Sequence, residues 1–178
     1  MNLSHNENII LYVIERTPGL GKTAAMKILY FLQQVKQMRL GYDFDIYTYG
    51  PYTSEVTDNL DTLISSGLIK STQYSVNNSV NSYVGYELNI SESGKEVIKE
   101  LPNEDQNSIQ DVLDFTKGKP AKTLELYSTI VFINQLYLKN KIPNNQEIII
   151  DKVHEIKPHF DNKVILEAYN RLYEKKYI

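Results

Sequence analysis

A pair of strand-like runs, set in a pattern that is otherwise mostly helical, limits the folds that this chain can adopt. The runs are LIKSTQYSV and YVGYELNI, and the uncharged stretch SVNNSVNS at residues 75–82 separates them. β-Branched and aromatic residues bounded by clustered Asn and Ser residues are typical of a β-hairpin. The chain therefore has to place one hairpin among helices, with its tip in the Asn-rich stretch.

Three helices are predicted before this hairpin. Apolar residues recur at helical spacing over about residues 5–16 and 22–38, and again in a segment that Thr53 or Ser54 can cap and Gly67 can end. Between the second and third helices, DFDIYTYGPY alternates in polarity, which predicts one short strand that ends in a Gly-Pro turn.

A fourth helix is predicted directly after the hairpin, over residues 91–100, where Ser93 and Glu96 have the spacing of a capping box. The resulting element order is that of a winged helix, and YELNISESGKEVIKEL resembles the segment that follows the wing in such proteins. From residue 103 onwards the apolar spacing is helical throughout, with breaks near Pro120, Pro143 and Pro158. We therefore predict an α+β fold, with a winged-helix-like domain at residues 1–102 packed on a C-terminal helical bundle at residues 103–178.

Composition limits the class of protein without naming a function. The chain has 178 residues, a formal net charge of −3 and no cysteine, so we expect no disulfide and no thiolate metal site. No apolar run reaches the length of a membrane span. These observations predict a cytoplasmic protein that does not enter a membrane.

The string GLGKT at residues 19–23 ends like a phosphate-binding loop, G-x-x-x-x-G-K-[ST]. Arg16 stands where the first glycine of that loop is required, and a helix rather than a strand is predicted before it. We therefore interpret the string as a turn followed by the start of the second helix, and we predict no nucleotide cofactor.

Several stretches resemble a known bacterial family, the YwgA-type proteins. KTAAMKILYFLQ and the later YTYGPYTSEVTDNLDTLISSGLI carry the resemblance in the first half, and LELYSTIVFIN and VHEIKPHFDNKVILEAYNRLYEKK carry it in the second. The closest signature is YGPY at residues 49–52, before a helix that ends in GLI at residues 67–69. This resemblance implies a fold but no assigned activity.

A more distant resemblance is to the Panacea antitoxin domain, and Met26 departs from its pattern, where glutamine is expected. The resemblance implies that the chain neutralises a toxin by binding it directly, in the setting of a defence operon. The matching residues are Lys27, Leu29, Tyr30, Phe31 and the later pair Gly50 and Pro51.

Catalytic and metal-binding residues are not evident from the pattern. The chain has three histidines, and His154 and His159 are five residues apart with a proline between them, so they do not share a helix face. Asp43 and Asp45 point to one side of the predicted strand, where a solvated strand edge explains them without a cation. We therefore predict that the protein is not an enzyme and holds neither metal nor cofactor.

Charge argues against the DNA-binding role that a winged helix suggests. The third predicted helix would read bases, yet it contains three acidic residues and no Lys or Arg. A DNA-binding transcriptional regulator therefore remains the alternative, with nucleic acid bound weakly or not at all. Its candidate surface comprises the basic residues near the second helix, Lys22, Lys27, Lys36 and Arg39.

Tyrosine is abundant, with 14 residues in the chain, and several crowd the segment before the third helix. Tyrosine suits protein interfaces because its ring buries a large area while its hydroxyl stays hydrogen-bonded. We therefore predict a non-catalytic regulatory module that binds another protein, in an antitoxin or phage-defence setting; the sequence leaves the partner's identity and a homodimer open. The predicted partner surface comprises Tyr47, Tyr49, Tyr52, Glu55, Asp58, Asn59 and Asp61.

Overall fold

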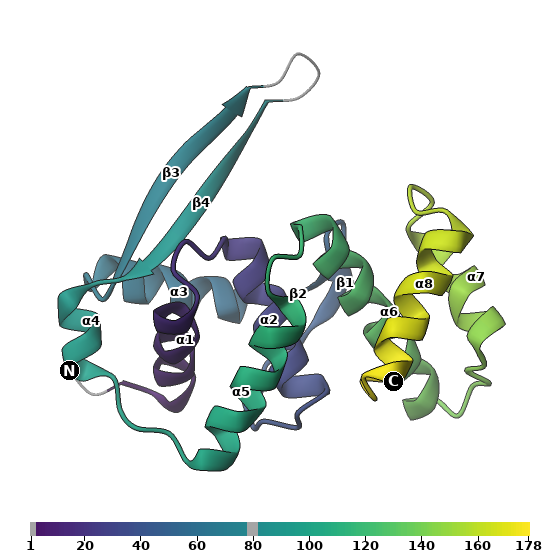
Figure 1. Ribbon diagram of the computed structural model, residues 1–178, viewed down its shortest axis with the longest axis horizontal. Helices are drawn as coiled ribbons and strands as arrows, with labels where there is room; N and C mark the ends of the chain where they lie inside the picture. Colours follow the sequence, from purple (N-terminus) through teal and green to yellow (C-terminus); the bar gives the residue numbers. More distant parts are fainter. Residues whose placement is uncertain (1–2, 78–81) are drawn as a thin grey trace. The chain divides into compact units, whose positions relative to one another are not determined.

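The computed structural model describes residues 3–77 and 82–178 of the chain (Figure 1). Within these ranges the fold is α+β and mostly helical, with eight helices and two antiparallel β-hairpins. The helices are α1 (His5–Arg16), α2 (Lys22–Gln34), α3 (Ser54–Ser65), α4 (Glu92–Val97), α5 (Asn103–Thr116), α6 (Ala121–Lys139), α7 (Gln146–Ile156) and α8 (Asn162–Glu174). The strands are β1 (Asp45–Tyr47), β2 (Gly50–Tyr52), β3 (Ile69–Asn77) and β4 (Ser82–Ile90).

The chain separates into two compact units, and each draws on two stretches of sequence. The first unit contains Met1–Asp43 and Thr53–Lys117, and the second contains Phe44–Tyr52 and Gly118–Ile178. The boundary predicted between residues 102 and 103 differs from this division in two respects. Helix α5 belongs with the first unit, and the β1–β2 hairpin belongs with the second although it precedes α3 in the sequence.

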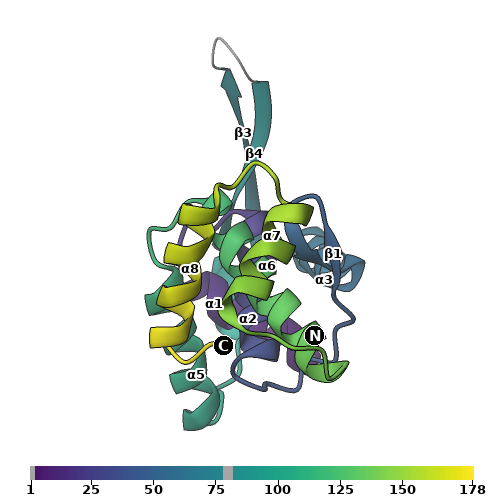
Figure 2. The same cartoon turned by 90° about the vertical axis from the view of Figure 1, so that its right-hand side faces the viewer.

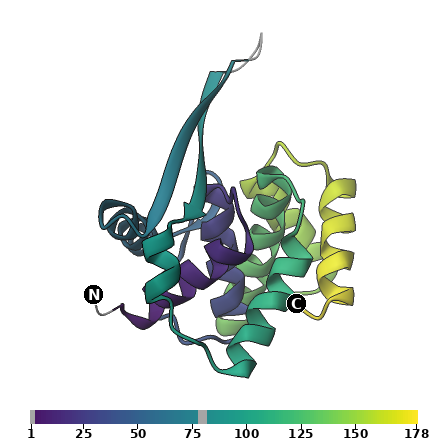
Figure 3. The ribbon, with the colours of Figure 1, turned by 60° about the vertical axis from the view of Figure 1, so that its left-hand side comes forward.

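Helices α1 and α2 supply most of the core of the first unit. A capping box begins α1: the Ser4 hydroxyl accepts from the backbone N–H of Glu7 at 3.2 Å, and the Ser4 N–H donates to the Glu7 carboxylate at 2.7 Å. Helix α5 runs beside α2 (Figure 3), and the rings of Phe31 and Phe115 meet edge to face, with centroids 6.2 Å apart. Side chains from α1 and α2 are buried on nearly all sides, as expected for helices at the centre of a unit.

Helix α3 leads into the longer hairpin, β3–β4. The predicted cap is confirmed, because the Thr53 hydroxyl accepts from the backbone N–H of Glu55, and Gly67 ends the helix with a φ of +73°. Strands β3 and β4 pair from Ile69 opposite Ile90 to Asn77 opposite Ser82. The hairpin extends away from the helices of the first unit (Figure 1). Part of the predicted tip, residues 78–81, lies outside the described residues.

The helix predicted at residues 91–100 is shorter, and its predicted cap is wrong. Helix α4 ends at Val97, and its N-cap is Ser91 rather than Ser93. The Ser91 hydroxyl accepts from the backbone N–H of Gly94 at 2.9 Å and donates to the carbonyl of Gly67 at 2.7 Å. Ser91 is favoured over Ser93 as the N-cap because its hydroxyl bonds both to the first turn of α4 and to the turn after α3.

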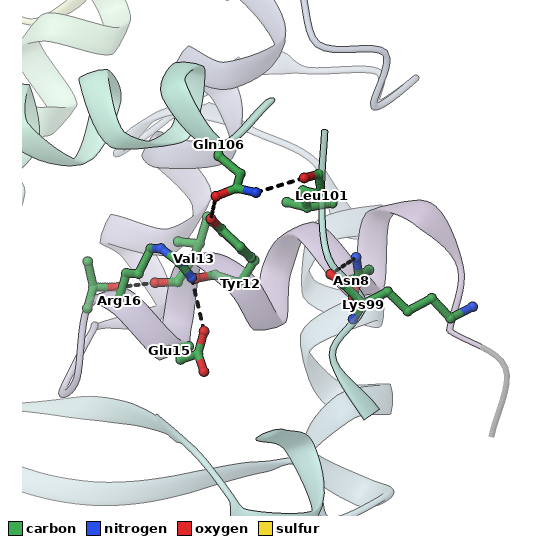
Figure 4. A network of polar contacts seen from close by, with 9 residues as sticks. Asn8, Tyr12, Val13, Glu15, Arg16, Lys99, Leu101 and Gln106 are labelled. Atoms are coloured by element: carbon green, nitrogen blue, oxygen red, sulfur yellow. Dashed lines mark hydrogen bonds and ion pairs between the residues drawn. The ribbon is translucent and has the colours of Figure 1, made fainter. Parts of the chain in front are cut away.

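The segment between α4 and α5 is attached to α1 by side-chain hydrogen bonds (Figure 4). The amide of Asn8 pairs with the backbone of Lys99 in both directions, at 3.1 and 2.8 Å. The Tyr12 hydroxyl donates to Gln106 at 2.8 Å, and Gln106 in turn donates to the carbonyl of Leu101. These bonds explain why α5 joins the first unit rather than the helices that follow it.

In the second unit, α6, α7 and α8 pack on one another (Figure 2). Residues 124–131 of α6 are buried on all sides of the helix, and β2 also packs on this helix. The KPHF sequence makes the predicted turn between α7 and α8, and Asp161 is the N-cap of α8.

The single strand predicted in DFDIYTYGPY is instead a hairpin of two three-residue strands. Asp45 pairs with Tyr52 and Tyr47 pairs with Gly50, so the turn lies at residues 48 and 49. Gly50 and Pro51 are therefore in β2 rather than in a turn. The prediction failed because a Thr-Tyr turn has none of the usual turn residues, whereas Gly-Pro is a strong turn signal.

Within the part of the chain that the structure describes, no helix combines the length and the apolar character that crossing a lipid bilayer requires.

Candidate functional site

The short β1–β2 hairpin is held against α6 by a close backbone contact at Gly50. This residue has a φ of +85°, which L-residues with a side chain rarely adopt. A Cβ atom at Gly50 would lie 3.1 Å from the Ser128 hydroxyl, 3.2 Å from the Thr129 hydroxyl and 3.3 Å from the Glu125 carbonyl. Both the backbone conformation and the limited space therefore favour glycine here.

A buried lysine attaches the turn of this hairpin to the helices of the second unit. Lys157 follows directly after α7, and its Nζ donates to the carbonyls of Tyr47, at 2.9 Å, and Thr48. The same Nζ lies 3.1 Å from Oε1 of Glu125, on α6. We call Lys157, Glu125 and these two carbonyls the lysine clamp, because the clamp joins one turn and two helices through a single ammonium group.

The charges of the lysine clamp are shielded from water. The side chains of Lys157 and Glu125 are 5% and 8% exposed. Glu125 Oε1 lies within ion-pair distance of Lys157 but makes no hydrogen bond among the described residues. The buried Thr129 hydroxyl also makes no hydrogen bond there. A buried pair of this kind costs desolvation energy, so removing one partner leaves a charge that is expensive to bury.

A histidine lies at the edge of the lysine clamp. His159 Nε2 is 3.5 Å from Oε1 of Glu125, and its half-exposed ring packs on Phe160 with centroids 4.3 Å apart. His154 does not join it, because its Nδ1 is 2.8 Å from the carbonyl of Phe160. Among the described residues, no group of three or more His, Cys, Asp or Glu side chains could hold a metal ion.

The turn held by the lysine clamp presents two tyrosines to solvent. Tyr47 is 59% exposed and Tyr49 is 69% exposed. The third predicted tyrosine, Tyr52, is half-buried and meets the ring of Tyr47 edge to face, with centroids 5.3 Å apart. The structure thus brings the three predicted tyrosines together on one hairpin of the second unit.

The predicted partner residues of α3 lie in the first unit, on a largely acidic helix face. Glu55, Asp58 and Asp61 are exposed, whereas Asn59 is half-buried and donates to the hydroxyl of Tyr42 at 2.8 Å. Burial raises the pKa of the Tyr42 phenol, and the hydrogen bond from Asn59 opposes this shift. Asn59 therefore has a structural partner, and the exposed part of the predicted set on α3 is acidic.

The four basic residues of the alternative nucleic-acid surface differ in exposure. Lys22 pairs with Asp61 at 2.9 Å, and its Nζ lies 5.0 Å from the centre of the Tyr86 ring. Lys36 pairs with Asp111 at 2.5 Å, and Lys27 is buried. Arg39 is the exposed member of the four. Lys22 and Lys36 are thus paired with carboxylates, and Lys27 is too buried to reach nucleic acid.

The GLGKT string forms the turn and helix start that its sequence context predicts. The N–H of Gly19 donates to the Leu88 carbonyl at 3.1 Å and to the Asn89 side chain at 2.9 Å, and the Leu88 N–H donates to the carbonyl of Leu20 at 2.8 Å. Gly21 is the N-cap of α2. The string is therefore bound to the outer edge of β4, a structural role that its sequence alone did not reveal.

The lysine clamp was not predicted from the sequence, although weak signals for it exist. Glu125 is the lone charged residue in the apolar stretch LELYSTIVFIN, and such an acid usually has a buried partner. Lys157 precedes a proline in a turn, where nothing distinguishes it from an exposed lysine. Its partners are backbone carbonyls about a hundred residues away in the chain, which residue patterns do not identify.

No protein-family model matches the chain, and no curated protein matches it. The resemblances to YwgA-type proteins and to the Panacea domain therefore rest on the quoted motifs alone.

Proposed function

We propose that this chain is a non-catalytic regulatory module that binds another protein through the turn of the β1–β2 hairpin. One observation carries the proposal: two tyrosines are more than half exposed on a turn whose backbone is bonded to a buried lysine. Exposed aromatic side chains held on a constrained backbone are suited to recognition, because their contact area is large and little entropy is lost on binding.

The lysine clamp favours a binding role over a catalytic one. Its ammonium group donates to two carbonyls and lies beside a carboxylate, so it is not available to a substrate. A general base or nucleophile would have to be reachable by the reacting atoms, and Glu125 and Lys157 are both buried. The cluster supports the position of Tyr47 and Tyr49 instead.

The proposal includes a basic partner surface and a defence-related role. The acidic residues of α3 would attract a basic protein and repel nucleic acid. The antitoxin or phage-defence setting is inferred from the resemblance to the Panacea domain. A winged-helix arrangement of the first unit is also part of the proposal, and the order α1, α2, α3, β3, β4 supports it.

A DNA-binding transcriptional regulator is the second candidate, and one observation favours it. The β3–β4 hairpin extends from the first unit as the wing of a DNA-binding winged helix does. The charges on α3 argue against it, because the exposed Glu55 and Asp58 repel phosphates, and the third acid, Asp61, is paired with Lys22.

Quantitative capture from native lysate tests the proposed function. The wild-type chain and a Tyr47→Ser/Tyr49→Ser variant would be immobilised at equal density, and bound proteins would be quantified by mass spectrometry. Tyr173→Ser is the matched control, because Tyr173 on α8 is 65% exposed. We expect a partner that the wild type and the control retain and the double variant loses. Equal retention by all three proteins would contradict the proposed site.

A further inference from the structure

The outer part of the β3–β4 hairpin carries no charged side chain. Residues 71–86 contain neither acidic nor basic side chains, and the described side chains of Thr72, Gln73, Ser75 and Val84 are exposed. The ring of Tyr74 lies across Gly85, where a Cβ atom would be 2.3 Å from it. Two-stranded hairpins are marginally stable alone, and exposed strand edges usually carry charges that prevent pairing. This edge lacks that protection.

The direction of the backbone groups along β3 follows from the contacts of β4. The N–H and carbonyl of Leu88 bond to Leu20 and Gly19, so they point away from β3. Ser71 is opposite Leu88, and in an antiparallel ladder both residues of such a pair direct their backbone groups outwards. Because this pattern alternates along the strand, Gln73 and Ser75 also direct their N–H and carbonyl groups away from β4.

The two edges of the hairpin are covered to different extents. The edge of β4 is occupied by Leu20 at Leu88, and a Cβ atom on Gly21 would lie 3.6 Å from the carbonyl of Tyr86. No strand pairs with the outer edge of β3 among the described residues. The open edge is therefore that of β3, at Ser71, Gln73 and Ser75.

We propose that this edge pairs with the same edge of a second copy of the chain, which gives a four-stranded antiparallel sheet. A two-fold axis at Gln73 places it opposite its own counterpart and places Ser71 opposite Ser75 of the second copy. All three outward-directed residues then form hydrogen-bonded pairs in one register.

The absence of charged residues around Gln73 favours a second copy of the chain as the strand that pairs with this edge. A side chain on a two-fold axis lies next to its own counterpart, so a charge at or close to the axis would be repelled by the same charge of the second copy. The uncharged stretch around Gln73 avoids this repulsion, and it offers no charge to attract a foreign strand. Because both copies use the same edge of β3, this two-fold pairing closes as a dimer.

Sedimentation velocity over a range of concentrations tests the dimer. We expect the wild type to sediment as a dimer at high concentration, and Gln73→Lys to weaken dimerisation by about fivefold or more, because like charges would face each other across the axis. Val84→Lys is the matched control: Val84 is exposed on the same sheet face but on β4. In the proposed sheet, the two copies of residue 84 are three strand spacings apart, about 14 Å or more.

Cross-linking provides a second measurement that does not depend on a weakened variant. Because the chain has no cysteine, Gln73→Cys introduces a single thiol, and its counterpart would lie about 5.5 Å away between Cα atoms. A short bifunctional thiol reagent should link Gln73→Cys into dimers and leave Val84→Cys largely unlinked. A monomer at every concentration, equal cross-linking of both variants, or a dimer that Gln73→Lys leaves unchanged would overturn the proposal.

Discussion

At the scale of single residues, Lys157 carries a positive charge in a part of the second unit that water barely reaches. Its length allows the ammonium group to reach the carbonyls of Tyr47 and Thr48 while it stays near Glu125. The tyrosine side chains of the turn are exposed, but their backbone is bonded to the interior. The candidate site therefore combines accessible side chains with a constrained backbone.

Lys157→Met keeps the approximate length of the side chain but removes its charge. We expect this variant to destabilise the folded chain. The Glu125 carboxylate would then be buried without its ammonium partner, which typically costs roughly 3–5 kcal/mol. Urea unfolding followed by circular dichroism measures the loss. Adding Glu125→Leu to Lys157→Met should restore part of the stability, because no charge is then left unpaired. If Lys157→Met alone is as stable as the wild type, the ion pair between Lys157 and Glu125 is not important for stability.

The phenol of Tyr30 should make folding sensitive to alkaline pH. Tyr30 is buried in α2, and burial raises its pKa far above the ordinary value of about 10. The unfolded chain therefore loses this proton at a lower pH than the folded chain, so the stabilisation is complete below pH 10 and is lost as pH rises above it. The loss from this group is at most about 1.4 kcal/mol per pH unit.

Urea titrations of the wild type and Tyr30→Phe at pH 8, 10 and 11 test this expectation. The variant lacks the ionisable group, so its unfolding free energy should fall less between pH 10 and 11. Identical slopes for the two proteins would mean that other groups cause the alkaline loss.

At the scale of elements, the β1–β2 hairpin depends on α6 for its shape. Gly50→Ala should cost about 1–2 kcal/mol for the positive φ and a further 1–3 kcal/mol for crowding against Ser128 and Thr129. Gly118→Ala separates the two effects, because Gly118 has a φ of +68° and a Cβ atom there would meet nothing within 4 Å. Thermal or urea unfolding measures both. An equal loss in the two variants would mean that the contact with α6 does not constrain the hairpin.

The helices could be predicted from the sequence because their signals are local. The apolar spacing of α1 and α3, the cap at Thr53 and the stop at Gly67 each depend on residues within a few positions of one another. The β3–β4 hairpin was predicted for the same reason, since its strand residues and turn residues are contiguous. Neighbouring residues were sufficient to identify each of these elements.

The β1–β2 hairpin and the lysine clamp could not be predicted because the residues that stabilise them are distant in the sequence. The turn at Thr48 and Tyr49 is stabilised by Lys157, and the fit of Gly50 depends on three residues of α6. Tyr47 and Tyr49 are exposed, and the sequence did not indicate which contacts hold their backbone. In the β1–β2 hairpin, tertiary contacts placed the turn at Thr48 and Tyr49, whereas the local sequence predicted it at Gly50 and Pro51.

At the scale of the whole molecule, the charge of the chain predicts weak binding to nucleic acid. The net charge is −3, and the basic residues considered for nucleic acid are largely paired or buried. Any DNA binding should therefore be weak and should fall steeply as salt increases. Mobility shifts measured at several salt concentrations test this. Sequence-specific binding that persists at about 200 mM salt would contradict it and would favour a transcriptional regulator.

We propose that the clamped tyrosine turn binds a protein partner. The most direct test is a calorimetric titration of the captured partner against the wild type, Tyr49→Ala and Tyr173→Ala, with circular dichroism to confirm that each variant is folded. Loss of an aromatic hot spot typically costs about 2 kcal/mol, so Tyr49→Ala should weaken binding by about thirtyfold. Tyr173→Ala, at a comparably exposed site on α8, should bind like the wild type. Wild-type affinity in folded Tyr49→Ala, or an equal loss in Tyr173→Ala, would contradict the account.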